Sequence, residues 1–217
     1  MEVYARYFDT QDYSFRMDTL LCFGQSAELL GSAVVLNPGS SKCKEESLTC
    51  DELNKIREFY KDKKDVGDFD SWKKFSPDST MREIERIFNG QHIDKKTELN
   101  GIIQIFNLFN LKNSDSDSAI KEMCQIENQY LFSNDIHLRF YNKIVYFGFG
   151  KKMLKYDILR KRACDIFKNA PITSKENYEV LFEKNDFYHP MYILRTSSKH
   201  KDFLEKFYKK FKEQNKK

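Results

Sequence analysis

Four short runs of apolar residues recur along the chain, and each stops at or near a polar residue or a glycine. They cover residues 32–36, 101–106, 144–147 and 178–182. Short runs rich in Val, Ile, Phe and Tyr predict strands that are buried in a sheet. Two further strands are predicted near residues 3–7 and 16–23.

Helical patterns lie between the predicted strands. Two capping boxes, Thr49-x-x-Glu52 and Thr80-x-x-Glu83, mark the starts of two helices. The predicted helices end at about residues 60 and 88, and three more cover residues 117–131, 151–168 and 199–215. The last of these carries an apolar stripe that predicts core packing.

The alternation of strands and helices predicts a single α/β domain over residues 1–217. We expect three α/β/α layers around a central, mostly parallel sheet. The charged stretch 61–77 interrupts the alternation and predicts a loop. The composition fits one domain with a large core, because 40% of the 217 residues are hydrophobic and 15% are aromatic.

The sequence also argues against several classes of protein. No apolar run approaches the length of a transmembrane helix, and the first residues lack the pattern of a signal peptide. The five cysteines form no C-x-x-C pair, so we expect no metal, iron–sulfur cluster or other cofactor. We expect a cytoplasmic monomer without a membrane partner.

Positive charge is concentrated at the C-terminus. The net charge is only +4, but residues 199–217 hold eight lysines against three acidic residues. This asymmetry predicts a polyanionic partner such as DNA. A solvated helix face is an equally common explanation.

Polar residues and glycines follow the predicted strands. Asn37, Asn107, Gly148–Gly150 and His189 come at or soon after strand ends, where ligands bind in open parallel sheets. Together they predict a pocket with two side-chain amides, an imidazole, and a glycine turn whose backbone can come close to a ligand. Taken singly, Asn37 also fits a turn, Asn107 a helix cap and His189 a buried structural histidine.

These strand ends resemble motifs of the uracil-DNA glycosylase superfamily. The matching segments are 35–39 (VLNPG), 103–107 (IQIFN), 144–151 (IVYFGFGK) and His189-Pro190. The first is similar to the water-binding motif of the mismatch-specific branch, and order and spacing agree from about residue 30 to 195. Residues 76–82 and Asn134-Asp135 are similar to an uncharacterised bacterial family of the same apparent fold.

The resemblance implies a DNA glycosylase, an enzyme that flips a nucleotide out of DNA and hydrolyses its N-glycosidic bond. His189 would donate a hydrogen bond to the leaving base, and Asn37 would hold the attacking water. Asn107 would read the base edge. Asp78 and Asp135 are candidate assisting carboxylates, although each also fits a helix cap.

Other residues are candidates for contacts with the nucleic acid. Phe109 and Phe149 are the aromatic residues closest to the predicted pocket, and either would stack on the flipped base. Met191 and Tyr192 would wedge into the duplex, and both also fit the core. Phosphate contacts are expected from the C-terminal lysines and from Lys151, Lys152 and Lys155.

The sequence departs from the superfamily at two places. Val35 stands where a glycine is usual, and residues 191–194 (MYIL) replace the expected Ser-Pro-Leu-Ser. The resemblance implies uracil as the default base, but the altered second motif and the loop 61–77 favour a different or bulkier base, such as a hypermodified cytosine in phage DNA. Two alternatives are a nucleoside- or nucleotide-processing enzyme and a catalytically silent DNA-binding or protein-interaction domain.

Overall fold

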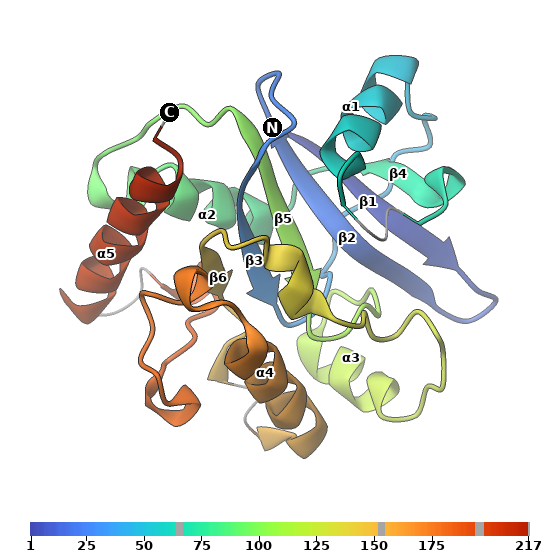
Figure 1. Cartoon of the computed structure of the whole chain (residues 1–217). Coiled ribbons are helices and arrows are strands. Elements are labelled where there is room, and N and C mark those ends of the chain that lie inside the picture. The colour runs from blue at the N-terminus through green and yellow to red at the C-terminus, as the bar shows by residue number, and fades with distance from the viewer. Residues whose placement is uncertain (64–66, 152–154, 194–197, 217) are drawn as a thin grey trace.

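A computed structural model describes residues 1–63, 67–151, 155–193 and 198–216. It contains a six-stranded sheet in the order β4-β1-β2-β5-β3-β6 (Figure 1). The strands are β1 (Glu2–Asp9), β2 (Ser14–Phe23), β3 (Leu29–Val35), β4 (Trp72–Phe75), β5 (Gly101–Asn107) and β6 (Val145–Phe147). The helices are α1 (Cys50–Tyr60), α2 (Ser79–Phe88), α3 (Ser116–Met123), α4 (Asp157–Asn169) and α5 (Ser198–Gln214).

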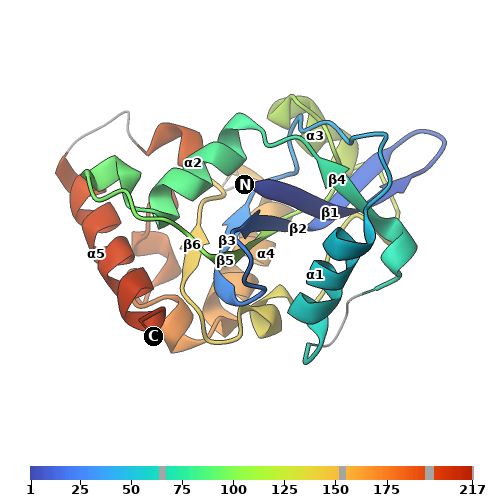
Figure 2. The same cartoon turned by 90° about the horizontal axis from the view of Figure 1, so that it is seen from above.

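Helices cover both faces of the sheet, and each face has its own apolar core. Side chains of α2 and α5 pack on one face. Those of α3 and α4 pack on the other, where α1 covers the β1–β2 end. In the view from above, α2 and α1 lie on opposite sides of the sheet (Figure 2). The predicted three-layer α/β fold is therefore confirmed.

The sheet is mixed, and its parallel part holds the strand ends of interest. β3 lies between β5 and β6 and is parallel to both. β2 is antiparallel to β5 and β1, and β1 is antiparallel to β4. Val35 of β3 pairs with Asn107 of β5, so the carboxyl ends of these two strands lie side by side. The segments that follow them must then meet at one edge of the sheet.

Two predictions about strands are wrong. Residues 178–182 are not a strand: Val180 is 93% exposed, and the hydroxyl of Tyr178 accepts a hydrogen bond from the amide of Phe147, the last residue of β6. The stretch 61–77 is not only a loop, because it contains β4. Trp72 and Phe75 of β4 are buried and the lysines between them are not, so the strand is too short to stand out among charged residues.

The helix boundaries also shift. α1 begins at the predicted capping box of Thr49, but α2 is capped by Asp78 rather than Thr80. α3 ends at Met123, well before residue 131. α4 begins at Asp157, and part of its predicted start lies outside the described residues. α5 packs its apolar stripe into the core as expected.

Candidate functional site

The turn after β3 holds the first candidate residue, Asn37. Gly39 completes this turn with φ +68°, a conformation that favours glycine. Asn37 is half-buried, and its Nδ2 donates a hydrogen bond to the backbone oxygen of Asn113 at 3.0 Å. This bond fixes the orientation of the amide and leaves the Oδ1 acceptor for another group.

Asn107 ends the neighbouring strand β5. Its side chain is buried, and its Nδ2 donates to the backbone oxygen of Arg16 at 3.3 Å. The amide is thus held by β2 on one side of β5, while Val35 pairs with it on the other. The side chain still has an oxygen acceptor, but one of its two N–H donors serves the fold.

Asp78 connects α2 to the same strand ends. Its Oδ1 accepts a hydrogen bond from the Met81 amide at 2.9 Å and so caps α2. Its Oδ2 lies 3.8 Å from Nη2 of Arg16. The carboxylate also lies against the turn after β3, because a Cβ on Gly39 would be 3.7 Å from Oδ2. The capping role and a place in the site therefore coexist.

Asn37, Asn107 and Asp78 line one small cavity together with Arg16. The cavity has a volume of about 30 Å³ and is also lined by residues of the turn after β3, of β2 and of the first turns of α2. A water molecule needs about 10–15 Å³ of such space and two to four polar partners. The cavity therefore suits one or two waters, and it is much too small for a pyrimidine.

Arg16 is a site residue that the sequence analysis missed. It is 3% exposed, and its guanidinium donates through Nη2 to the backbone oxygen of Pro38. Burial lowers its pKa to about 10, partly opposed by Asp78, so it stays charged at neutral pH. The available signal was an arginine at the start of the predicted strand 16–23, which also carries Asp18 and Thr19.

His189 lies before a short 3-10 turn, Pro190–Tyr192. Its Nδ1 accepts a hydrogen bond from the Met191 amide at 3.3 Å. Burial lowers the pKa of His189 to about 4, so the imidazole is neutral at neutral pH. With Nδ1 as an acceptor, the ring proton of the neutral form belongs on Nε2, which is then a donor.

The end of β6 sets the position of His189. A Cβ on Gly148 would lie 3.0 Å from Cδ of Pro190, and one on Gly150 would lie 3.4 Å from Cβ of His189. The 3-10 turn also packs against α2. His189 is therefore beside the end of β6, which neighbours β3, but it is not among the residues that line the small cavity.

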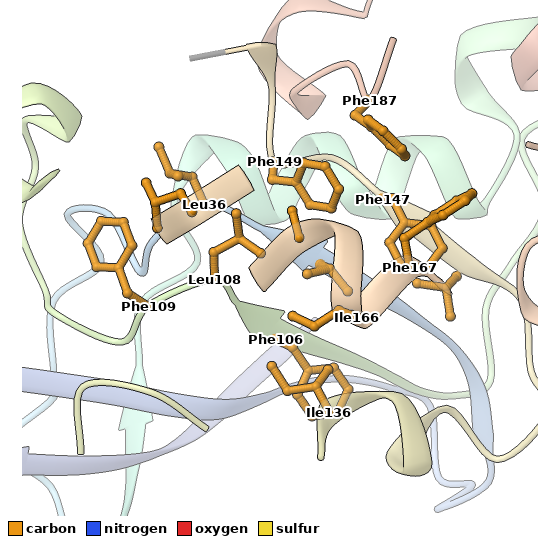
Figure 3. Packing of buried hydrophobic residues seen from close by; sticks show 14 of the residues in the cluster. Leu36, Phe106, Leu108, Phe109, Ile136, Phe147, Phe149, Ile166, Phe167 and Phe187 are labelled. Carbon is orange, nitrogen blue, oxygen red and sulfur yellow. The ribbon is translucent and has the colours of Figure 1, made fainter. Parts of the chain in front are cut away.

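Phe109 and Phe149 are packed in the apolar core, at 0% and 1% exposure (Figure 3). The ring of Phe149 is 4.7 Å from that of Phe187, centroid to centroid. The expectation that either ring stacks on a base needs correction, because neither ring has a face open to a ligand in this structure. Of the two wedge candidates, Tyr192 is 55% exposed and Met191 is half-buried.

Of the remaining candidates, those that the structure describes do not line the small cavity. Asp135 is exposed with φ +49°, and its side chain caps no helix. Lys151 is 70% exposed and pairs with Asp186 at 2.9 Å. Lys155 is exposed, and Lys152 lies outside the described residues.

The C-terminal end of α5 lies at the opposite edge of the sheet. Nδ2 of Asn215 donates to the backbone oxygen of Leu30, near the start of β3, at 2.9 Å. Lys212 and Lys216 line a hollow of about 840 Å³ at that edge. This hollow is the larger of the two, but the strand-end side chains do not reach it.

The described residues give no sign of a metal centre or a membrane span. They contain no group of three or more His, Cys, Asp or Glu side chains placed to hold a metal ion. None of the helices among them has both the length and the apolar character needed to cross a membrane.

Comparisons with known proteins found no relative of this chain. No protein-family model, curated protein or solved structure matches it.

Proposed function

We propose that this protein is a DNA glycosylase that hydrolyses the N-glycosidic bond of a flipped-out uracil or modified pyrimidine. The observation that carries the proposal is the water-sized cavity between the ends of β3 and β5, which is lined by Asn37, Asp78 and Asn107. An amide and a carboxylate beside one water are the groups that a hydrolysis needs to hold and deprotonate its nucleophile. The resemblance at the strand ends supports the same reaction.

Asn37 and Asp78 would have different roles towards the water in the cavity. Oδ1 of Asn37 accepts a hydrogen bond from it, because Nδ2 is already used by Asn113. An amide does not take a proton at neutral pH, so Asn37 orients the water. Asp78 lines the same cavity, and its carboxylate accepts the proton that the water loses as it attacks C1′ of the sugar.

His189 would act on the leaving base. Negative charge builds up on the base as the glycosidic bond breaks, and a fixed donor at that oxygen lowers the barrier. A neutral imidazole with Nδ1 occupied by the Met191 amide supplies this donor through Nε2. Because the pKa of His189 is held low by burial, the residue donates a hydrogen bond rather than a proton.

The base would lie outside the small cavity, towards His189, since the cavity admits only water. Asn107 is 2% exposed and lines that cavity, so the strand ends must open as the base binds for its Oδ1 to reach the base edge. One Nδ2 hydrogen already serves the backbone oxygen of Arg16, and Oδ1 is the free acceptor. An acceptor favours a base edge that carries a donor, such as N3–H of uracil or the exocyclic amine of a cytosine. Tyr192 and Lys151 are exposed and would contact the duplex and its phosphates.

The test is an abasic-site assay on end-labelled duplexes with excess protein. The panel contains uracil, mismatched bases and glucosylated hydroxymethylcytosine. We expect strand breaks after alkali with at least one duplex, and a loss of about a hundredfold or more in Asn37→Ala. Asn113→Ala is the control, because it keeps the backbone oxygen that holds Asn37.

Two results would count against the proposal. The first is a panel in which no duplex reacts although the protein is folded. The second is an Asn37→Ala variant that retains the rate of the wild type. Cleavage of free nucleosides without reaction on DNA would instead identify a nucleoside-processing enzyme.

A further inference from the structure

Arg16 has hydrogen-bonding capacity that the protein does not use. Among the described residues, neither Nε nor Nη1 finds an acceptor, and both atoms are buried. A charged donor that is buried without an acceptor carries a large desolvation cost. Arg16 lines the cavity with Asn37 and Asp78, so the cavity is the place where this cost can be offset.

The contacts that Arg16 does make hold it against the site. Nη2 donates to the backbone oxygen of Pro38, in the turn that carries Asn37, and lies 3.8 Å from Oδ2 of Asp78. The guanidinium carbon is 5.3 Å from the centre of the Phe75 ring. By contrast, Arg162 donates through both Nε and Nη2 to backbone oxygens, as expected of an arginine that only supports the fold.

We propose that Arg16 is a positioning residue that donates a hydrogen bond to the hydrolytic water. A water has two hydrogens and two lone pairs. If it donates to Oδ1 of Asn37 and to the carboxylate of Asp78, and accepts from Arg16, one lone pair remains. That remaining lone pair is the one available to attack. The hydrogen bonds to the three side chains therefore fix the direction in which this lone pair points.

The step this serves rests on the glycosylase activity proposed above. The free lone pair of the water forms the bond to C1′, and the bond from C1′ to the base nitrogen breaks with its electron pair on the base. Asp78 takes one proton from the water, so the products are the abasic sugar and the base anion, which later gains a proton. Arg16 neither gains nor loses a proton in this step.

The kinetic test compares Arg16→Gln, Arg16→Lys and Arg139→Gln in single-turnover excision on a reactive duplex. Arg139 is a second buried arginine, paired with Asp18 at 2.7 Å. Its Nε also lacks an acceptor among the described residues, but Arg139 does not line the cavity, so it separates a buried arginine from one at the water site. We expect Arg16→Gln to lose about a hundredfold in rate per folded molecule with DNA affinity within about threefold. Arg16→Lys, which keeps a charged N–H donor, recovers about tenfold of that loss. Arg139→Gln keeps its rate per folded molecule while its melting temperature falls.

A high-resolution crystal structure of the wild type gives a readout that does not need activity. We expect an ordered water within hydrogen-bonding distance of Nε or Nη1 of Arg16 and of Oδ1 of Asn37. If wild type excises bases and Arg16→Gln is equally fast, or if Arg16 contacts no water, the inference is wrong and the glycosylase proposal stands. If the water is present and no duplex reacts, the water site stands and the glycosylase proposal fails.

Discussion

Asn37, Asn107 and Asp78 each use one polar atom to hold the backbone and keep another for the cavity. The used atoms bond to the Asn113 oxygen, the Arg16 oxygen and the Met81 amide. This division fixes the orientation of each side chain before a ligand arrives, which is how a preorganised site lowers a barrier. It also explains why a residue that caps a helix can serve in the site.

Asp78→Asn and Asp135→Asn form a matched pair. Asparagine caps a helix about as well as aspartate, so Asp78→Asn keeps the start of α2 but removes the proton acceptor. We expect its single-turnover excision rate to fall about a hundredfold, compared per folded molecule because Arg16 loses its counter-charge. Asp135 is exposed and outside the cavity, so Asp135→Asn keeps the wild-type rate. Equal rates in the two variants would remove Asp78 from the reaction.

His189 predicts how stability depends on pH. Burial holds its pKa at about 4 in the folded protein against 6.5 in a free histidine. The unfolded chain therefore binds a proton first as the pH falls, and stability is lost between pH 6.5 and 4, by up to roughly 3 kcal/mol. His189→Gln should lack this part of the loss in urea titrations at pH 7 and pH 4. An identical pH dependence in both proteins would show that His189 is not buried as described.

At the scale of elements, the sequence allowed prediction of the strands that are long and apolar. β3, β5 and α1 were predicted because each combines a clear period with a clear boundary. β4 was missed because only two of its four residues are buried. The run 178–182 was wrongly predicted to be a strand because residue type alone does not distinguish the exposed Val180 from a buried valine.

The candidate site shows the same division. Asn37, Asn107 and His189 could be predicted because a polar residue directly follows an apolar run or precedes a proline. Arg16 lies within a strand, and its importance depends on long-range contacts with Pro38 and Asp78. No local pattern carries that information, so the packing of β2 against α2 had to be seen first.

Gly148→Ala tests how β6 supports His189. A Cβ at this position would lie 2.4 Å from Cε1 of Tyr146, whose ring is buried, and 3.0 Å from Cδ of Pro190. The Tyr146 ring must then shift, at a cost of about 1–3 kcal/mol, and its hydroxyl donates to the backbone oxygen of Tyr188, the residue before His189. Because a shift of about 1 Å in a site can cost a hundredfold in rate, we expect excision to slow by tenfold or more per folded molecule. A variant that is less stable but equally fast would mean that the turn does not position a reacting group.

At the scale of the molecule, the two edges of the sheet differ. The strand-end residues and the cavity lie at the carboxyl edge of β3, and the end of α5 lies at the amino edge, where Asn215 bonds to Leu30. One charge of α5 is also engaged, since Lys210 pairs with Glu176 at 3.0 Å and with Glu213 at 3.3 Å. DNA bound at the carboxyl edge would therefore not rely on the lysines at the C-terminal end of α5.

Charge reversal at the two edges of the sheet tests which edge binds DNA. We expect Lys212→Glu with Lys216→Glu to leave duplex affinity within about twofold of wild type, because both residues line the hollow at the amino edge. Lys151→Glu, beside the end of β6, should weaken binding and lower the slope of log affinity against log salt by about one. Binding isotherms at several salt concentrations measure both. The opposite ranking would place DNA on the α5 edge.

The proposed activity is the release of an intact base from DNA by hydrolysis. The most direct test is mass spectrometry of the small molecules released from a duplex that carries one candidate base, with abasic sites counted in the same sample. We expect free base and abasic sites in equal amounts from wild type, and about a hundredfold less of both from Asn37→Ala. Release of a nucleoside or nucleotide, or the absence of free base from every duplex of the panel, would contradict the proposal.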